Sequence, residues 1–553
     1  MTARIDQPRV LKALLLGAYL LAGAGLIRHT SPTTDEVAFH MVNGYTYLRT
    51  HDYRMSPANP PLLRQWMALP WLIGMPQLRL DRTSWQQADS EPFAREFFYG
   101  DHREIADRLL YGSRAMILLL GLLGAVVVHR WSRSLYGERG ALLSLAAYVS
   151  APPLLGHAAI AHTDVGVSVL CLLAFYRLWR YLTAPNARRL WFFAAAFGLA
   201  GAAKYNALYF APVLVGIVGW RMGWKAMLSA VGAMLLAGGL VVWASYGLEC
   251  RPLLGPGVPR IAEKEGYIRA ISGAIRPGDA DLAERLVVAA RTVPIPAPSY
   301  ILGIAGIVRS HQSPYWHYSF GRWGYEMRWY HYLFSFATKM TIPFLLLLLM
   351  RALWRGPSDQ GRGEGLVLLL PMAVTAVLTA KDSTGVGLRY LFPAILPLFV
   401  WVGGVCRGGS PFPRTACAWM LAAAGLLAAA KAYPVNIGYF NEFVGGTSGG
   451  YRYVRGGDVD WGQGLKPLKR YLDERGIGRI KLRYFGTADP TFYGLDFDEL
   501  TPEELREPGP HVYAISLFYL EHASWTSRYR PDAMVDGCIF VYDLRRKTTP
   551  TPA

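Results

Sequence analysis

The chain has 553 residues, of which 52% are hydrophobic and only 17% are charged, and its formal net charge is +18 at pH 7. A chain this long and apolar exceeds what one soluble core can bury, which excludes a single-domain soluble protein and predicts membrane-spanning helices. The basic excess would suit nucleic-acid binding, but its distribution along the chain argues against that function.

Apolar runs recur along most of the chain. A helix needs about 20 apolar residues to cross about 30 Å of hydrocarbon, so the shorter runs predict tilted, short or re-entrant helices, and we expect about eleven spans, give or take two. The first run lacks the small-residue pattern of a signal-peptide cleavage site and is expected to remain as a span. The candidate runs are 10–27, 111–131, 139–160, 163–182, 189–203, 205–220, 224–246, 331–353, 364–380, 386–406 and 412–432.

Basic residues gather in alternate connections between these runs. Under the positive-inside rule, all of these connections are cytoplasmic if the N-terminus is cytoplasmic. The charge is therefore an orientation signal with a contribution to anionic-lipid contact, and nucleic acid is not an expected partner. The basic residues are Arg4, Arg9, Lys12, Arg130, Arg133, Arg139, Arg177, Arg180, Arg188, Arg189, Arg221, Lys225, Arg351, Arg355, Arg362, Arg407 and Arg414.

Two loops of the membrane part, 28–110 and 248–330, fall on the outer side in this topology. The first contains "NPPLLRQWMALPWLI" (59–73), which suits either a helix lying in the membrane interface or a buried loop helix. The second contains the aromatic stretch "SPYWHYSFGRWGYEMRWYHYLF" (313–334), typical of an interfacial belt but also suited to a sugar or lipid site.

The tail, 433–553, is expected to be an outer soluble α/β domain that follows a transmembrane domain over 1–432. Helical spacing with a glycine stop predicts a helix within 461–476. The segments "RIKLRYFG", "HVYAISLF" and "CIFVYDL" read as strands. Of the five cysteines, only Cys250 and Cys538 fall on the outer side, where a disulfide between them is compatible with the environment.

Charged residues at the outer ends of the predicted helices all share one face of the membrane. A lysine or arginine there commonly extends to the headgroups, and Asp35 and Asp164 each stand where a helix cap would. The combination of acids and bases on one face favours a functional cavity instead. The residues are Asp35, Glu36, His162, Asp164, Lys204, Lys339, Lys381, Asp382 and Arg389.

Such a combination suits group transfer from a lipid phosphate carrier. The leaving phosphate requires cations, and the attacking hydroxyl requires a carboxylate that orients it or accepts its proton. A cation about 4 Å from a phosphate contributes about 4 kcal/mol at an effective dielectric constant of 20. The acids are therefore expected to face the sugar and the acceptor, and the bases the phosphate.

At these residues the chain resembles the dolichyl-phosphate-mannose protein mannosyltransferases and their bacterial relatives, including the aminoarabinose transferases that modify lipid A. The resemblance implies a polytopic glycosyltransferase of the GT-C fold that uses a polyprenyl-phosphate sugar, in the inner membrane of a bacterium. The motifs are "TTDE" (33–36), "HTD" (162–164), "KYNAL" (204–208), "TKMTIP" (338–343) and "GLRYLFPAILP" (387–397).

The tail is similar to the periplasmic extension of a bacterial subgroup of family 39 glycosyltransferases, through "YFNEFVGG" (439–446) and "DWGQGLKPLKRYL" (460–472). The chain departs from that subgroup at "GGDVDWGQG" (456–464), where Asp-Ser-Asn-Leu-Asp-Trp-Gly-Gln-Asp is usual. The departure puts a ligand role of the missing acids in doubt.

The resemblance also implies a role for each matching residue. Asp35 is the expected general base or acceptor-orienting carboxylate, and Glu36 supports the donor sugar or positions Asp35. Asp164, with His162, holds the acceptor or the donor sugar. Lys204, Lys339 and Arg389 bind the carrier phosphate, with Tyr390 as a weaker helper. The implied reaction is an inverting displacement at the anomeric carbon, and the acceptor is a protein, lipid or glycan hydroxyl.

Two alternatives remain at this point. Glu36 and His40 lie four residues apart, a spacing that suits a shared divalent metal, although the resembled branch implies no cofactor. A polytopic transporter or lipid-linked sugar flippase would also hold charges at membrane depth, but transporters often contain inverted repeats, and the sequence contains no evident repeat.

Overall fold

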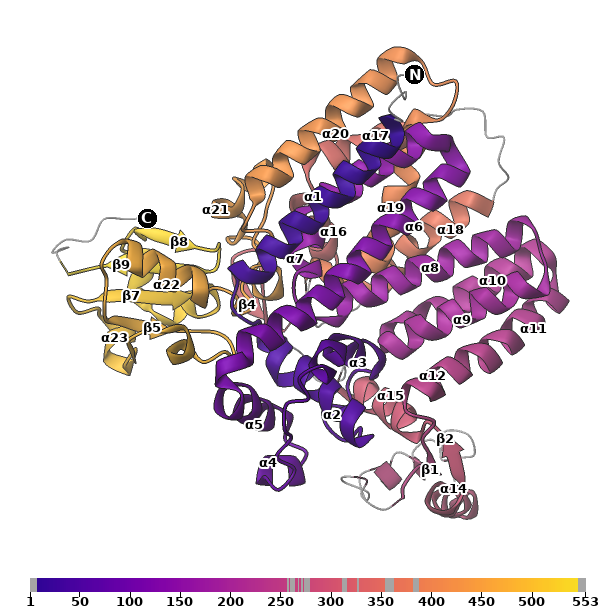
Figure 1. Cartoon of the computed structure of the whole chain (residues 1–553), viewed down its shortest axis with the longest axis horizontal. Helices are drawn as coiled ribbons and strands as arrows, with labels where there is room; N and C mark the ends of the chain where they lie inside the picture. The colour runs from indigo at the N-terminus through magenta and orange to yellow at the C-terminus, as the bar shows by residue number, and fades with distance from the viewer. Residues whose placement is uncertain are drawn as a thin grey trace.

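The structure is a computed structural model that describes residues 7–255, 258, 264–266, 268–269, 272, 279–310, 316–325, 328–353, 363–380 and 387–545. A large bundle of helices makes up most of the molecule, and a small sheet lies beside one end of it (Figure 1). Lys381 and Asp382 of the predicted site lie outside the described residues.

The bundle contains helices of very different lengths. They are α1 (Gln7–His29), α6 (Ala106–Val149), α7 (Pro152–Ala158), α8 (Thr163–Thr183), α9 (Ala187–Ala203), α10 (Ala211–Met222), α11 (Trp224–Ala233), α12 (Gly239–Ser245), α16 (His331–Lys339), α17 (Ile342–Leu353), α18 (Gly363–Ala380), α19 (Phe392–Val402) and α20 (Phe412–Ala432). The chain is thus mostly helical, as its composition predicts.

The expected count of about eleven spans is not confirmed. Six helices among the described residues are long and apolar enough to cross a membrane, or seven if α16 and α17, which meet at 110°, form one broken span. The element α6 contains two helices that meet at Gly137, whose φ of 78° is not helical, and they correspond to the expected span 111–131 and to the first part of the expected span 139–160. Helices such as α10 are short, because 12 residues at about 1.5 Å each extend only about 18 Å.

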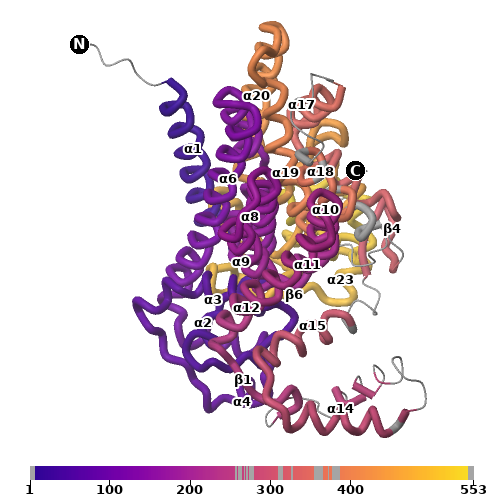
Figure 2. Tube along the Cα trace, turned by 90° about the vertical axis from the view of Figure 1, so that its right-hand side faces the viewer, coloured from indigo at the N-terminus to yellow at the C-terminus, as the bar shows by residue number. Residues whose placement is uncertain are grey.

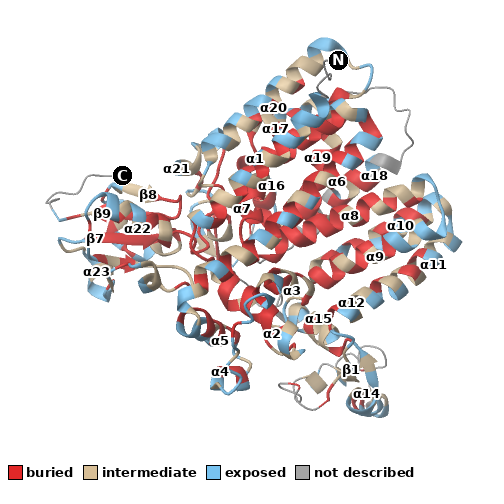
Figure 3. Ribbon diagram, in the orientation of Figure 1, coloured by how far each residue is buried: buried red, intermediate tan, exposed pale blue. Residues whose placement is uncertain are grey.

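The core of the bundle lies around α8 and α19. The candidate span Leu388–Cys406 contains α19, and 89% of the residues in its most apolar stretch are buried. In the corresponding stretch of α20, only 17% of the residues are buried. Buried residues accordingly fill the middle of the bundle, while exposed apolar residues cover α11, α12 and α20 (Figure 3). Apolar side chains facing outward suit contact with lipid.

The two predicted outer loops lie at the same end of the bundle, where their helices cluster in Figure 2. Helix α3 buries Leu63 and Met67 and contacts both α2 and α8, with Leu63 next to Gly166 of α8, which favours the buried loop helix over an interfacial one for this stretch. The helices are α2 (Val42–Thr50), α3 (Leu62–Ala68), α4 (Thr83–Gln86), α5 (Ser90–Arg95), α14 (Ala280–Thr292) and α15 (Pro298–Ser310). Two short antiparallel hairpins, β1 (Cys250–Pro252) with β2 (Pro294–Pro296) and β3 (His317–Ser319) with β4 (Arg322–Gly324), belong to the second loop.

The tail contains a five-stranded mixed sheet of order β6-β5-β7-β9-β8. Strand β5 pairs in parallel with β6 and β7, whereas β9 pairs antiparallel with β7 and β8. The strands are β5 (Ile480–Arg483), β6 (Phe497–Glu499), β7 (Val512–Ser516), β8 (Ala533–Val535) and β9 (Ile539–Asp543), and the helices are α21 (Thr447–Gly450), α22 (Leu465–Glu474) and α23 (Pro502–Arg506). The three segments that read as strands in the sequence form β5, β7 and β9.

The tail is hydrogen-bonded to the segment that follows α1. The backbone N–H of Ser31 donates to the carbonyl of Gln463 at 3.0 Å, and that of Thr34 to Trp461 at 2.9 Å. The Thr487 hydroxyl donates to the carbonyl of Thr34 at 2.8 Å. These contacts join residues more than 400 positions apart, so the tail packs directly against the outer end of the bundle.

The disulfide considered between Cys250 and Cys538 is not formed, since both cysteines are free. Cys250 is exposed in β1 of the second outer loop, whereas Cys538 is buried next to β9 in the sheet of the tail. The two thiols therefore belong to different parts of the outer region.

Candidate active site

Five of the predicted residues meet in one group, here called the charged cluster: Asp35, His162, Asp164, Lys204 and Arg389. Asp35 Oδ2 lies 3.3 Å from His162 Nε2 and 3.9 Å from the Arg389 guanidinium. Asp164 lies 2.9 Å from His162 Nδ1, 2.5 Å from Lys204 Nζ and 3.6 Å from Arg389 Nε. Acids and bases from four parts of the sequence therefore share one site, as the sequence predicts.

Helix ends position these side chains. Asp35 immediately precedes η1 (Glu36–Met41), a π-helical turn of the kind often found at functional sites. His162 is the N-cap of α8, Lys204 lies directly after α9, and Arg389 lies in the short helix η7 (Leu388–Leu391) that leads into α19. Since each residue ends or begins a helix at the same end of the bundle, the charged cluster follows from the order of the helices.

The two carboxylates of the charged cluster have different environments. The side chain of Asp35 is 26% exposed, whereas that of Asp164 is only 3% exposed. Burial opposes ionisation of Asp35, but His162 and Arg389 outweigh it and hold the pKa of Asp35 below its ordinary value. Burial likewise disfavours the charge of Lys204, but Asp164 outweighs it and raises the lysine pKa. Asp35 is thus the ionised, accessible acid, and Asp164 the enclosed one.

Glu36 turns away from the charged cluster into a fully buried ion pair with Arg114. Arg114 donates to both carboxylate oxygens at 2.8 and 2.7 Å, and the backbone N–H groups of Ala161 and Thr33 donate at 2.6 and 2.7 Å. Burial disfavours the charge, yet these donors hold the pKa of Glu36 below its ordinary value. Of the two roles left open for Glu36, these contacts agree with positioning Asp35, because they fix the turn that carries it.

Lys339 contacts the tail rather than the charged cluster. Its buried ammonium donates to the carbonyl oxygens of Ile437, at 3.0 Å, and Asp458, and it lies 4.3 Å from the centroid of the Phe440 ring. A buried lysine needs such acceptors. None of these contacts is with the charged cluster, where Lys339 was expected to bind the carrier phosphate. The sequence did not predict this position, because it does not reveal that the tail folds back onto this helix end.

Asp458, which the sequence analysis did not select, supports the turn of Arg389. Its carboxylate accepts hydrogen bonds from the Leu388 N–H at 2.7 Å and from the Ser335 hydroxyl at 3.2 Å. The turn begins at Gly387, whose φ is 94° and whose Cα faces the same carboxylate so closely that a Cβ would lie 2.7 Å from it. Only glycine suits both conditions.

Trp461 is the second tail residue that the sequence analysis missed. The Arg389 guanidinium carbon lies 3.6 Å from the centroid of the buried indole ring, and the His162 ring lies 4.7 Å from it. Lys204 Nζ lies 4.8 Å from the centroid of the Tyr390 ring. Aromatic faces therefore flank both cations of the charged cluster. The only sequence signal for Trp461 is its place in the motif "DWGQG", which carries part of the family resemblance.

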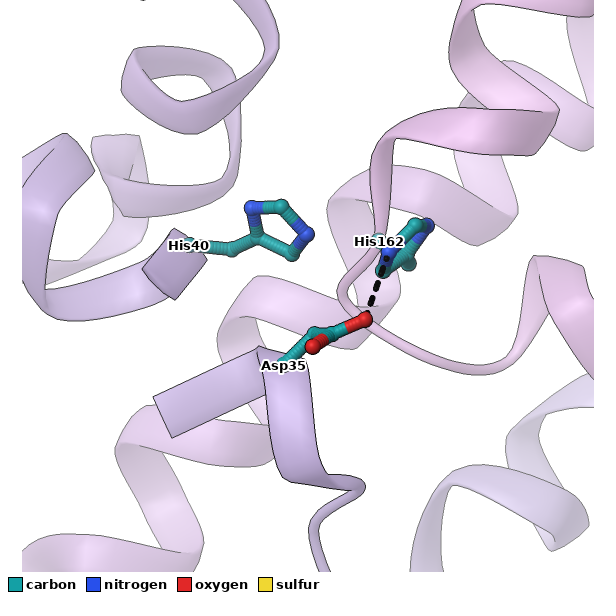
Figure 4. A group of neighbouring side chains, drawn as sticks. All are labelled: Asp35, His40 and His162. Carbon is teal, nitrogen blue, oxygen red and sulfur yellow. Dashed lines mark ion pairs between the residues drawn. The ribbon is translucent and has the colours of Figure 1, made fainter. Parts of the chain in front are cut away.

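His40 lies beside the charged cluster and is almost completely buried. Its ring centroid is 4.5 Å from that of His162, and neither of its nitrogens has a hydrogen-bond partner. Burial, followed by the neighbouring His162, lowers the pKa of His40 well below its ordinary value. Asp35, His40 and His162 place one ligand atom each within 4.8 Å of one another, a set that suits a metal ion (Figure 4). The pair considered from the sequence, Glu36 with His40, is not brought together in this way, because Glu36 is engaged with Arg114.

Comparison with known proteins supports the resemblance. Residues 100–246 match the family model described as dolichyl-phosphate-mannose-protein mannosyltransferase. No curated protein matches the chain. Among solved structures, ArnT from Cupriavidus metallidurans bound to undecaprenyl phosphate is 13% identical, with all of both chains covered and a TM-score of 0.33. An oligosaccharyltransferase from Archaeoglobus fulgidus is 11% identical, with 75% of this chain and 54% of that chain covered and a TM-score of 0.39.

The family match includes two of the five motifs quoted for the resemblance, "HTD" and "KYNAL", and with them the enclosed part of the charged cluster. Over residues 100–246, the expected similarity to the dolichyl-phosphate-mannose-protein mannosyltransferases is thereby confirmed.

Proposed function

We propose that the protein is a glycosyltransferase that moves a sugar from a polyprenyl-phosphate carrier to a hydroxyl acceptor at the outer face of the membrane. The observation that carries this proposal is the charged cluster itself, in which an accessible acid and an enclosed acid share one site with two cations. Its place at the ends of apolar helices suits a donor that reaches the site from the bilayer and an acceptor that arrives from water.

Asp35 accepts the proton of the acceptor hydroxyl in this reaction. It is ionised and more exposed than Asp164, as a base that meets an aqueous substrate requires. The acceptor oxygen forms a bond to the anomeric carbon while the bond between that carbon and the phosphate oxygen breaks. The electron pair leaves with polyprenyl phosphate, and the configuration at the anomeric carbon inverts.

Arg389 and Lys204 stabilise the departing phosphate. At about 4 Å, each cation contributes about 4 kcal/mol at an effective dielectric constant of 20, before the cost of loosening its present ion pairs is subtracted. Asp164 and His162 keep the two cations and the sugar in position relative to one another. Glu36, through Arg114, positions Asp35 and does not contact the substrate.

The proposed location is the inner membrane of a bacterium, with the N-terminus in the cytoplasm and the charged cluster and tail outside. The asymmetric distribution of Lys and Arg along the chain supports this orientation. The sugar and the acceptor stay open in this proposal, because the charged cluster recognises the phosphate and a hydroxyl rather than one glycan.

The proposal is tested with membranes that contain the protein and a polyprenyl-phosphate sugar labelled in the sugar. Wild type is expected to release free polyprenyl phosphate and to transfer the label to an envelope acceptor, which mass spectrometry identifies. Asp35→Asn is expected to reduce the turnover by about 100-fold or more, the usual contribution of a positioned base.

The matched control is Asp101→Asn, which changes an acid of the same outer region that pairs with Arg82. It should retain the wild-type turnover. Absence of carrier release by the wild type would contradict the transferase proposal, whereas equal turnover in Asp35→Asn and wild type would exclude Asp35 as the base.

A further inference from the structure

Aromatic residues cover one face of the hairpin β3–β4 in the second outer loop. Tyr318 pairs with Trp323 across the hairpin, and the same register places Trp316 opposite Tyr325. Residues that face each other in an antiparallel pair project to the same side, so these four side chains share one face. The ring centroids of Trp316 and Tyr325 are accordingly 4.8 Å apart, and the two residues are 52% and 53% exposed. Exposed apolar residues that gather in one patch mark an interaction surface.

The tail continues this surface. Strands β5 and β7 are parallel neighbours, so the segments that leave their carboxyl ends lie together. These segments bring Phe485 to 4.4 Å from Phe518, with the ring planes 14° apart, and Phe518 lies 5.2 Å from Trp323 of the hairpin. Together with Tyr519, whose ring is 5.3 Å from that of Phe518, they complete a set of exposed and partly exposed rings. This set, here called the aromatic platform, consists of Trp316, Trp323, Tyr325, Phe485, Phe518 and Tyr519.

Polar side chains border the aromatic platform where it lies on the tail. The guanidinium carbon of Arg483 is 4.6 Å from the centroid of the Tyr519 ring, and the Nε of this arginine has no hydrogen-bond partner among the described residues. The Glu521 carboxylate, whose side chain is 45% exposed, pairs with Arg455 at 2.9 Å. Aromatic rings beside hydrogen-bond donors and acceptors suit a ligand that has both apolar C–H faces and hydroxyl groups.

The aromatic platform leads to the turn that carries Asp35. Thr487 follows Phe485 by two residues, and its hydroxyl donates to the carbonyl of Thr34 at 2.8 Å. Two residues of extended chain cover at most about 7 Å, so Phe485 lies close to this contact. Thr34 directly precedes Asp35, the more exposed acid of the charged cluster. One end of the aromatic platform therefore lies beside the acid that meets the acceptor in the reaction proposed above.

We propose that the aromatic platform binds a saccharide, namely the glycan part of the hydroxyl acceptor. A sugar ring packs its C–H face against an aromatic ring, while its hydroxyl groups accept from Arg483 and donate to Glu521. Neighbouring rings of the platform are 4.4 to 6.3 Å apart, close to the length of one sugar residue in a linear glycan. The acceptor role rests on the proposed function, whereas saccharide binding is a separate property that is measured without a donor.

A membrane-interface belt is the other common use of exposed aromatic residues. Such a belt surrounds the ends of spanning helices, but Phe485, Phe518 and Tyr519 belong to the tail, whose sheet lies beside the bundle (Figure 1). They follow the carboxyl ends of parallel strands, which is where open α/β sheets bind soluble ligands. These positions favour a saccharide over the lipid headgroups.

The experiment uses the full-length protein in a detergent without a sugar headgroup, so that the detergent does not compete for the platform. Maltohexaose, chitohexaose and an oligogalacturonate are titrated into it by calorimetry, and wild type is expected to bind at least one of them. Trp316→Ala and Phe518→Ala are each expected to weaken that binding at least about 10-fold, the usual effect of removing an aromatic anchor. Trp316 is exposed, so its replacement tests the platform even if Phe518→Ala does not fold.

The matched control is Trp224→Ala, which removes an exposed tryptophan at the start of α11, next to Lys225 in a connection of the opposite parity. It should bind the glycan like the wild type. Failure of the wild type to bind any of the three glycans, or unchanged binding in either platform variant, would overturn the inference. Saccharide binding without carrier-phosphate release would support the platform and contradict only the proposed function.

A second measurement separates the saccharide from the membrane interface. The protein is reconstituted into vesicles that contain brominated phosphatidylcholine, which quenches tryptophan fluorescence on contact. The quenched fraction of the emission is expected to be no smaller in Trp316→Ala than in the wild type, because Trp316 faces water. Quenching that decreases in Trp316→Ala would place the aromatic platform in the membrane interface and overturn the inference.

Discussion

Replacement of Arg114 by methionine is expected to destabilise the protein strongly, because one arginine supports the whole turn that carries Asp35. Both Arg114 and Glu36 are 0% exposed. Besides Glu36, Arg114 donates to the backbone carbonyls of Ile27, Thr30 and Ser31 at 2.9, 3.1 and 2.8 Å. The substitution removes every one of these bonds and leaves a buried carboxylate without its counter-ion.

The magnitude follows from the broken pair and the orphaned carbonyls. Removing one partner of a buried ion pair costs about 3–5 kcal/mol, and the unsatisfied carbonyls add to that cost. Arg82 provides a matched control, since it pairs with Glu96 and Asp101 near the surface. Arg82→Met is expected to cost at most about 1 kcal/mol, the upper range for exposed pairs.

The free energies of unfolding are measured by titration with a denaturing detergent in mixed micelles, followed by circular dichroism and tryptophan fluorescence. Carrier-phosphate release, measured on the fraction of Arg114→Met that remains folded, should also fall, because the turn before η1 loses its anchor. The double variant Arg114→Met/Glu36→Leu is expected to regain part of the stability, since no uncompensated charge remains. Equal destabilisation by Arg114→Met and Arg82→Met would refute this reasoning.

Three further predictions concern the tail and the cations. Trp461→Leu is expected to weaken donor binding by up to about 30-fold, because a desolvated cation–π contact contributes about 2 kcal/mol to holding Arg389. Replacement of the exposed Trp316 by leucine is the control and should leave donor binding normal, and equal affinities of the two variants would contradict the prediction. Burial raises the pKa of Asp460 to about 7, so the folded tail keeps a proton that the unfolded chain has already lost. The free energy of unfolding should therefore fall by about 2 kcal/mol as the pH rises from about 5.5 to 7. Thermal melts at several pH values measure this dependence, which Asp460→Asn should abolish. Lys204→Met is expected to lower donor affinity and to destabilise the fold, since Asp164 loses its closest cation. Calorimetry measures the donor affinity, and thermal melts measure the stability. A variant unchanged in both would rule out Lys204 as a donor-binding cation and as the partner of Asp164.

The members of the charged cluster were predictable because of a simple property of polytopic chains. Successive helices alternate in direction, so loops of one parity meet at one face, and the positive-inside rule identifies that face. This argument brings Asp35, His162 and Asp164 together with Lys204 and Arg389, and the structure does the same. It says nothing about which residues of a long tail return to that face.

The residues that the sequence did not reveal depend on contacts over long separations. Asp458 and Trp461 follow the membrane part, and only the folding of the tail onto the bundle brings them to the turn of Arg389. Arg114 could have been selected from the sequence, since an arginine within the apolar run 111–131 is costly unless it is paired. The span count of about eleven stays unconfirmed among the described residues, where α6 contains two helices joined at the non-helical Gly137 and several other apolar helices are short.

The contacts of Lys339 show why the tail is part of the site rather than an attached module. A buried ammonium without acceptors is very unfavourable, and this one is satisfied by carbonyl oxygens of Ile437 and Asp458, both in the tail. The carboxylate of Asp458 in turn accepts from the N–H of Leu388, next to Arg389, and the ring of Trp461 covers the Arg389 guanidinium. A bundle without the tail would therefore lack the acceptors of one buried cation and the support of another. The membrane part alone supplies the charged cluster, but the tail is what holds Arg389 in place.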